Sequence, residues 1–248
     1  MRVLIADDNQ INREFVKGVL EGNDFRLAEA ADGEEAVAIC RESRFDAILM
    51  DIRMPQLDGI EATRQIRELA GYRDCPIIAL TADLQLEKSR DLEQLGFSAC
   101  LLKPVSRDRL LAMLQQQLDP DAAADPEDSK PAAASPVDRQ AALAAAGGSE
   151  DLVDRLLQML RVELSAFLPR IEQAIAGERW AEARDMAHKT RGSAGYTGAK
   201  VLQEAASQLE LAITREQPSE IHQAFQVLKQ AAFDLERYLQ QRGAESGA

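Results

Sequence analysis

The sequence predicts two domains of different fold class, an α/β domain followed by an all-α domain. Up to about residue 118, short apolar runs alternate with amphipathic stretches, and beyond about residue 138 every periodic stretch has helical spacing. Between them lies a segment rich in proline, alanine and acidic residues without apolar periodicity, which is typical of a solvated linker. We therefore expect domains at 1–119 and 138–242, a linker at 120–137 and a flexible tail at 243–248.

Five apolar runs in the first domain predict strands, and five amphipathic stretches predict helices. The expected strands cover 2–6, 25–30, 46–50, 76–80 and 98–102. The expected helices cover 11–21, 34–43, 60–70, 84–95 and 107–118. Strict alternation of strand and helix predicts a doubly wound parallel sheet with helices on both faces.

Four longer amphipathic stretches in the second domain predict a four-helix bundle. The first, 152–175, places apolar residues on one stripe: Leu152, Leu156, Met159, Leu160 and Leu164. Similar spacing continues in 179–189, 201–213 and 221–239. Residues 138–146 add a short leading helix.

Composition excludes several classes of function. The formal net charge of -13 argues against a nucleic-acid partner, because phosphates would be repelled. Cys40, Cys75 and Cys100 are an odd number without metal or disulfide spacing, which favours reduced thiols and a cytoplasmic location. The N-terminus lacks a signal-peptide pattern, and no apolar run approaches the ~20 residues of a membrane span.

Polar side chains stand where four of the five predicted strands end. They are Asp7, Asp8, Asp51, Thr81 and Lys103. Because the carboxyl ends of parallel strands meet at one edge of a sheet, we expect these side chains to converge. Only the second strand ends without such a residue, and the strand order 2-1-3-4-5 places that strand at a sheet edge.

Three carboxylates in one crevice repel one another unless a cation joins them. Oxygen ligands favour Mg²⁺, whose exchangeable waters suit phosphoryl chemistry. Thr81 and Lys103 can hold the oxygens of a phosphoryl group delivered to Asp51. The alternative interpretation is that each acid only caps a helix, as Asp58 could for the helix at 60–70.

Four motifs, in this order and spacing, resemble a response-regulator receiver domain with a flavodoxin-like fold. They are Asp7-Asp8-Asn9, "LMDIRMPQLDG" around Asp51, "LTA" at 80–82 and "LKP" at 102–104. Cys100 stands where receivers that signal by moving an aromatic ring carry Tyr or Phe, which puts an aromatic output switch in doubt.

The resemblance implies roles for these residues. Asp51 is the phosphoacceptor, and Asp8, Asp51 and the Arg53 backbone carbonyl bind Mg²⁺, with Asp7 assisting. Thr81 and Lys103 contact the phosphoryl oxygens. The Lys103-Pro104 peptide bond is expected to be cis.

A second candidate site lies in "AHKTRGSAGYTG" at 187–198. Helical spacing puts Arg191, Gly192 and Gly195 on or near the face of His188, and Gly198 ends the helix. Two glycines inside a helix cost about 1 kcal/mol each, which a flat docking surface around an accessible imidazole would explain. A neutral imidazole can attack phosphorus, and Arg191 can bind phosphoryl oxygens. The alternative is an ordinary surface histidine at a helix break.

The stretch resembles the signature of histidine-containing phosphotransfer (HPt) domains, although Thr190 stands where leucine is usual. The resemblance implies His188 as the phosphotransfer histidine, Arg191 as its basic partner, and Gly192 and Gly195 as a docking face. We therefore expect a two-component phosphorelay protein, a phosphoryl carrier and not an enzyme. Its partners would be a sensor histidine kinase and a receiver aspartate, its own or that of a downstream response regulator.

Alternatives stay open at this point. The protein could be a phosphate sink or modulator of a kinase, or an interaction module controlled by phosphorylation without onward transfer. Met1 directly before the first strand suggests a natural start, and a fragment of a longer hybrid kinase is the other possibility. The oligomeric state is not predicted.

Overall fold

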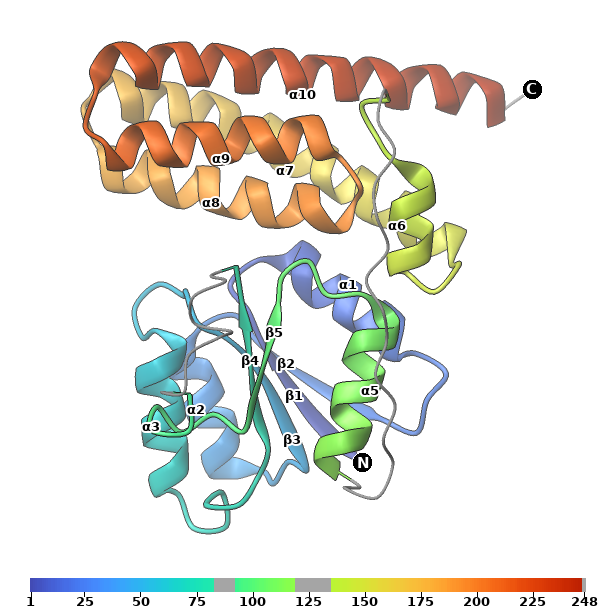
Figure 1. The fold of residues 1–248 in the computed structure, drawn as a ribbon, viewed down its shortest axis with the longest axis vertical. Helices are drawn as coiled ribbons and strands as arrows, with labels where there is room; N and C mark the ends of the chain where they lie inside the picture. The colour runs from blue at the N-terminus through green and yellow to red at the C-terminus, as the bar shows by residue number, and fades with distance from the viewer. Residues whose placement is uncertain (83–91, 119–134, 247–248) are drawn as a thin grey trace. The chain divides into compact units, whose positions relative to one another are not determined.

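The computed structural model describes residues 1–82, 92–118 and 135–246, with side chains described up to residue 242. The chain divides into two compact units, one built on a sheet and one helical (Figure 1). Most of the helix expected at 84–95 and most of the expected linker lie outside the described residues.

The first unit contains a five-stranded parallel sheet. Its strands are β1 (Arg2–Ala6), β2 (Arg26–Ala30), β3 (Ala47–Asp51), β4 (Ile77–Thr81) and β5 (Ala99–Leu102). Their order is β2-β1-β3-β4-β5, which confirms the predicted topology. The inner strands β3 and β4 are buried along their whole length, because helices cover both faces of the sheet.

Helices lie on both faces of this sheet. They are α1 (Gln10–Leu20), α2 (Gly33–Glu42), α3 (Gly59–Glu68) and α5 (Arg107–Leu118). Figure 1 shows α2 and α3 on one face, and α1 and α5 on the other. Asn9, Asp32 and Asp58 cap α1, α2 and α3 by accepting hydrogen bonds from backbone amides of the first turn.

The second unit is a helical bundle preceded by a short helix. Its helices are α6 (Arg139–Ala145), α7 (Glu150–Ala176), α8 (Trp180–Tyr196), α9 (Lys200–Thr214) and α10 (Pro218–Ser246). Within the bundle α8 packs against both α7 and α9, and α10 packs against α9 and α7 (Figure 1). The four leucines of the predicted stripe in α7 are buried and Met159 is partly exposed, so the four-helix bundle is confirmed.

Helix α10 is longer than expected. It continues to Ser246, past the predicted helix at 221–239 and into the residues assigned to a flexible tail. Gly243 lowers helix propensity there, but no proline follows to stop the helix. Across the parts of the chain that the structure describes, no helix is both long and apolar enough to span a membrane.

The turn between α8 and α9 depends on Gly198, which ends α8 as predicted. Its φ of 70° is in the left-handed region that glycine favours. A Cβ here would lie 2.5 Å from the carbonyl oxygen of Asp138. Asp138 donates its backbone N–H to the Gly198 carbonyl at 2.8 Å and pairs with Lys200 at 2.6 Å. The start of α6 is therefore held against this turn.

Candidate functional site

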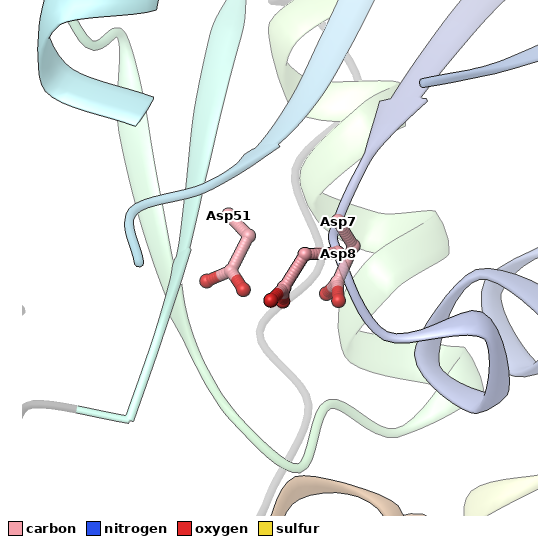
Figure 2. A group of neighbouring side chains, drawn as sticks. All are labelled: Asp7, Asp8 and Asp51. Atoms are coloured by element: carbon pink, nitrogen blue, oxygen red, sulfur yellow. The ribbon is translucent and has the colours of Figure 1, made fainter. Parts of the chain in front are cut away.

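Three carboxylates converge at the carboxyl edge of the sheet (Figure 2). Asp7 and Asp8 follow β1, and Asp51 ends the neighbouring strand β3. Each contributes an oxygen, and these oxygens lie within 4.8 Å of one another. Asp7 and Asp51 are buried, whereas Asp8 is partly exposed. The parallel pairing of β1 and β3 thus produces the cluster of acids that the strand ends predicted.

Lys103 is the cation next to this cluster. Its Nζ lies 2.6 Å from Asp7 Oδ2 and 2.9 Å from Asp51 Oδ2. The side chain is only 9% exposed, so these ion pairs are shielded from solvent. Lys103 directly follows β5, its backbone N–H donates to the Thr81 carbonyl at 2.6 Å, and the Lys103-Pro104 bond is cis.

The charges in the cluster do not balance. Burial raises the pKa of Asp51 to about 7; the Lys103 ammonium opposes this rise, and the charges of Asp7 and Asp8 add to it. A single ammonium therefore does not compensate three carboxylates. Oxygen ligands with surplus negative charge fit a small divalent cation such as Mg²⁺.

The loop after β3 holds Asp51 through a close backbone approach at Gly59. A Cβ at Gly59 would lie 1.9 Å from the Asp51 carbonyl oxygen, so only glycine fits. The Gly59 N–H donates to the Ile52 carbonyl at 2.9 Å, and Asp58 caps α3. Asp58 therefore caps a helix, the role that the alternative interpretation of the sequence gave to the acidic residues at the strand ends.

Two further predicted residues lie near this edge. Thr81 is the last residue of β4 and is buried, and β4 pairs with β3 and β5. The Arg53 backbone N–H lies 3.4 Å from Asp51 Oδ1, while the Arg53 side chain is exposed. The five predicted side chains thus come from the carboxyl ends of β1, β3, β4 and β5.

The second candidate site lies on α8 and α9. His188 Nδ1 lies 3.0 Å from Glu210 Oε1 and 3.1 Å from a terminal nitrogen of Arg191. Arg191 Nε lies 3.1 Å from the other Glu210 oxygen. A carboxylate only accepts and a guanidinium only donates, so the tautomer of the ring decides which neighbour Nδ1 bonds. When Nδ1 carries the proton and donates to Glu210, Nε2 has a free lone pair.

Sequence reasoning missed Glu210. The residue lies 22 positions after His188 and directly follows the buried Leu209 of α9. Its side chain is only 14% exposed, which is unusual for a glutamate and reflects its pairing with His188 and Arg191. The pairing depends on the register between α8 and α9, which the helical period of either stretch does not give.

The remaining residues of the motif lie inside α8. Gly192 and Gly195 are within the helix and partly exposed. Thr190, at the usual leucine position, is completely buried and donates its hydroxyl to the Met186 carbonyl at 2.9 Å. This bond explains how a hydroxyl is accommodated in the bundle core. Ser193 donates to Glu163 of α7 at 2.8 Å.

The doubly wound sheet with its acidic cluster, and the bundle with its histidine, define a protein of two-component phosphotransfer signalling. Residues 3–115 match the response regulator receiver domain, and residues 155–246 match the Hpt domain. The chain therefore belongs to the two-component phosphorelay proteins, with a receiver domain followed by an Hpt domain.

Its relatives include a signal transduction histidine-protein kinase and a virulence sensor protein. The chain is 34% identical to the signal transduction histidine-protein kinase BarA of Shigella flexneri over 206 residues, which is 80% of this chain and 22% of BarA. It is 30% identical to the virulence sensor protein BvgS of Bordetella bronchiseptica, over 85% of this chain and 18% of BvgS. The chain thus spans about a fifth of the length of these relatives.

Among solved structures, the chain is similar to the receiver domain of sensor histidine kinase PA1611 from Pseudomonas aeruginosa. The identity is 40%, over 47% of this chain and 96% of that domain, with a TM-score of 0.43. That structure is described as having a magnesium ion coordinated in the active site cleft.

Proposed function

We propose that Asp51 accepts a phosphoryl group from the phosphohistidine of a sensor histidine kinase, and that His188 exchanges phosphoryl groups with a receiver aspartate. The observation that carries this proposal is the presence, in one chain, of a buried acidic cluster around Asp51 and a histidine whose Nδ1 faces Glu210. The two sites supply complementary chemistry, an acyl phosphate and a phosphoramidate.

In the receiver, Asp8, Asp51 and the Arg53 carbonyl would hold Mg²⁺, with Asp7 assisting. When bound, the ion neutralises charge on the phosphoryl oxygens. Lys103 contributes its ammonium, which already contacts Asp51 at 2.9 Å, and Thr81 contributes its hydroxyl. Asp51 attacks phosphorus through a carboxylate oxygen while the bond from phosphorus to the kinase histidine breaks, so the receiver carries out its own phosphorylation.

In the Hpt domain, Nε2 of His188 is the attacking atom. Glu210 accepts the Nδ1 proton in a hydrogen bond, which orients the ring and stabilises the positive charge that forms on it. As the bond from Nε2 to phosphorus forms, the acyl oxygen–phosphorus bond breaks and the donor aspartate leaves as a carboxylate. Arg191 is close enough to bind the transferred phosphoryl oxygens after releasing its contact with Nδ1.

Gly192 and Gly195 are proposed as the docking face for the partner receiver. Their missing side chains leave the surface one and two turns beyond His188 flat. Lys189 and Lys200 lie beside this face and would favour an acidic partner, although both also have local acidic neighbours. A cytoplasmic location, inferred from the reduced cysteines, belongs to the same proposal.

Three modes of use fit these sites. In a relay, phosphate passes from the kinase to Asp51, then to His188 and on to a downstream regulator. In a sink, the Hpt domain drains a kinase or another regulator and Asp51 discharges by hydrolysis. In an interaction module, phosphorylation of Asp51 only controls access to the Hpt face. We favour the relay over the interaction module because the contacts among His188, Arg191 and Glu210 suit an exchange of phosphoryl groups, which an interaction module would not need.

The proposal is tested with the purified chain and a kinase labelled on its histidine. The wild type should acquire label that hydroxylamine releases, as expected of an acyl phosphate, and label that acid releases, as expected of a phosphoramidate. Asp51→Asn should remove the first kind and, in a relay, the second kind with it, whereas His188→Gln should remove only the second. His222→Gln is the matched control, because His222 is an exposed histidine whose Nδ1 lies 2.7 Å from the Pro218 carbonyl oxygen. Label that survives both substitutions would contradict the assignment of these residues.

A further inference from the structure

Asn12, in the first turn of α1, is a buried polar residue outside the set of side chains proposed to bind the cation or the phosphoryl group. It is 5% exposed and lies among the apolar residues Ile11, Phe15 and Val16 on the buried side of the helix. An amide in such a position is unfavourable unless it is hydrogen-bonded. Its presence therefore needs a specific partner.

That partner is Asp7. The Asn12 side-chain nitrogen lies 3.1 Å from both carboxylate oxygens of Asp7. The backbone N–H of Asn9 donates to Oδ1 of the same carboxylate at 2.9 Å, and Lys103 contacts Oδ2 at 2.6 Å. Asp7 is thus held from three directions, and the Asn12 amide spans both of its carboxylate oxygens.

The position of the Asn12 amide is itself fixed by the start of α1. Asn9 caps the helix by accepting from the backbone amides of Ile11 and Asn12, at 2.8 Å and 3.3 Å. Asp7, the cap and the first helical turn therefore form one connected hydrogen-bonded unit.

Fold stability alone is a poor explanation for this asparagine. Its side-chain oxygen is buried and has no hydrogen-bond partner among the described residues. A buried acceptor left without a partner lowers stability. An apolar residue would continue the buried stripe of α1 without that penalty, so the amide is better explained by what it does to Asp7.

We propose that Asn12 is a positioning residue for the cation site: its amide fixes the Asp7 carboxylate in the orientation that faces Asp8 and Asp51. The inference rests on the proposed function, since it presumes that the three carboxylates bind a divalent cation. Residues that orient a metal site by hydrogen bonds to its acidic groups commonly change metal affinity by about 10- to 100-fold when they are removed.

The test measures Mg²⁺ binding to the full chain by calorimetric titration, with thermal unfolding in EDTA recorded in parallel. Asn12→Leu keeps the shape and removes the donor, and Asn12→Ala serves if the leucine variant folds poorly. We expect either variant to bind Mg²⁺ about tenfold or more weakly. Thr63→Val is the matched control, because Thr63 is also completely buried with an unpartnered oxygen but lies in α3. It should leave Mg²⁺ affinity unchanged.

Each outcome has a separate meaning. If an Asn12 variant changes only the unfolding temperature and binds Mg²⁺ as the wild type does, the residue is structural and this inference is wrong. If the wild type itself shows no Mg²⁺ binding, or Asp51→Asn does not weaken it, the proposed cation site fails, and the inference about Asn12 fails with it.

Discussion

His188 Nδ1 and Glu210 Oε1 lie 3.0 Å apart across the α8–α9 pair. The second oxygen of Glu210 pairs with Arg191 Nε at 3.1 Å, so one carboxylate orients both the histidine and its basic neighbour. In the proposed mechanism Nδ1 donates its proton to Glu210, and Nε2 keeps the nucleophilic lone pair. It also makes Glu210 the residue whose removal most directly tests the chemistry of the Hpt site.

Glu210→Gln should slow phosphorylation of His188 by about 100-fold, the lower end of the range for a side chain positioned to handle a proton. The amide can still accept from Nδ1–H, but it lacks the charge that stabilises the imidazolium. The measurement is the single-turnover rate of label transfer from a phosphorylated receiver. Glu204→Gln, an exposed acid on the same helix, is the control. Equal rates for the wild type and Glu210→Gln would exclude this role.

Gly192→Ala and Gly195→Ala should each stabilise the bundle by about 1 kcal/mol while slowing transfer from a partner receiver. Alanine is the better helix former, and both positions lie inside α8. The added methyl groups would occupy the proposed docking face. Urea unfolding and transfer rates on the same samples test both effects.

Gly198→Ala is the contrasting variant. It should destabilise the bundle, because the backbone is left-handed at Gly198 and a Cβ would meet the Asp138 carbonyl oxygen.

The docking role has its own contradicting outcome. If Gly192→Ala and Gly195→Ala leave the transfer rate unaltered, these glycines do not form the docking face.

Gly59→Ala should destabilise the receiver by about 2 kcal/mol or more, since the new Cβ would lie 1.9 Å from the Asp51 carbonyl oxygen. Scanning calorimetry of the full chain measures the loss. Gly22→Ala provides a comparison, because Gly22 has a positive φ but open space around it. A loss at Gly59 no larger than that at Gly22 would show that the loop after β3 moves aside easily.

Asp51→Asn should stabilise the protein in EDTA, and more so at pH 8 than at pH 5. The pKa of Asp51 is raised from 3.8 to about 7 in the folded state, so folding favours the protonated form. The destabilisation from this carboxylate is therefore absent below about pH 4 and grows as the pH rises to about 7. Because the Lys103 ammonium offsets part of the Asp51 charge, we expect the free energy of unfolding of Asp51→Asn to exceed that of the wild type by about 1–3 kcal/mol at pH 8.

Urea unfolding at the two pH values, with and without Mg²⁺, measures this gain. Mg²⁺ should stabilise the wild type and have little effect on Asp51→Asn. A variant that is less stable than the wild type in EDTA at pH 8 would contradict the description of the cluster as an uncompensated site.

The sequence predicts the sheet order and the acidic cluster because both follow from local patterns. Asp51 and Thr81 prove to be the last residues of their strands, since their backbones still pair with Leu80 and Leu102. The contacts of Glu210 and Asn12 could not be predicted in the same way. Each contact joins side chains from two different segments of the chain, His188 with Glu210 and Asn12 with Asp7. Neither the helical period nor the position of a strand end predicts which residues come into contact across two segments.

In the proposed relay, phosphate reaches His188 by way of Asp51. The most direct test follows the acid-labile label on His188 over time after addition of a labelled sensor kinase, in the wild type and in Asp51→Asn. We predict that label appears first on Asp51 and then on His188, and that Asp51→Asn abolishes the label on His188. Label that stays on Asp51 until it is released as free phosphate, or that reaches His188 equally fast without Asp51, would contradict the relay.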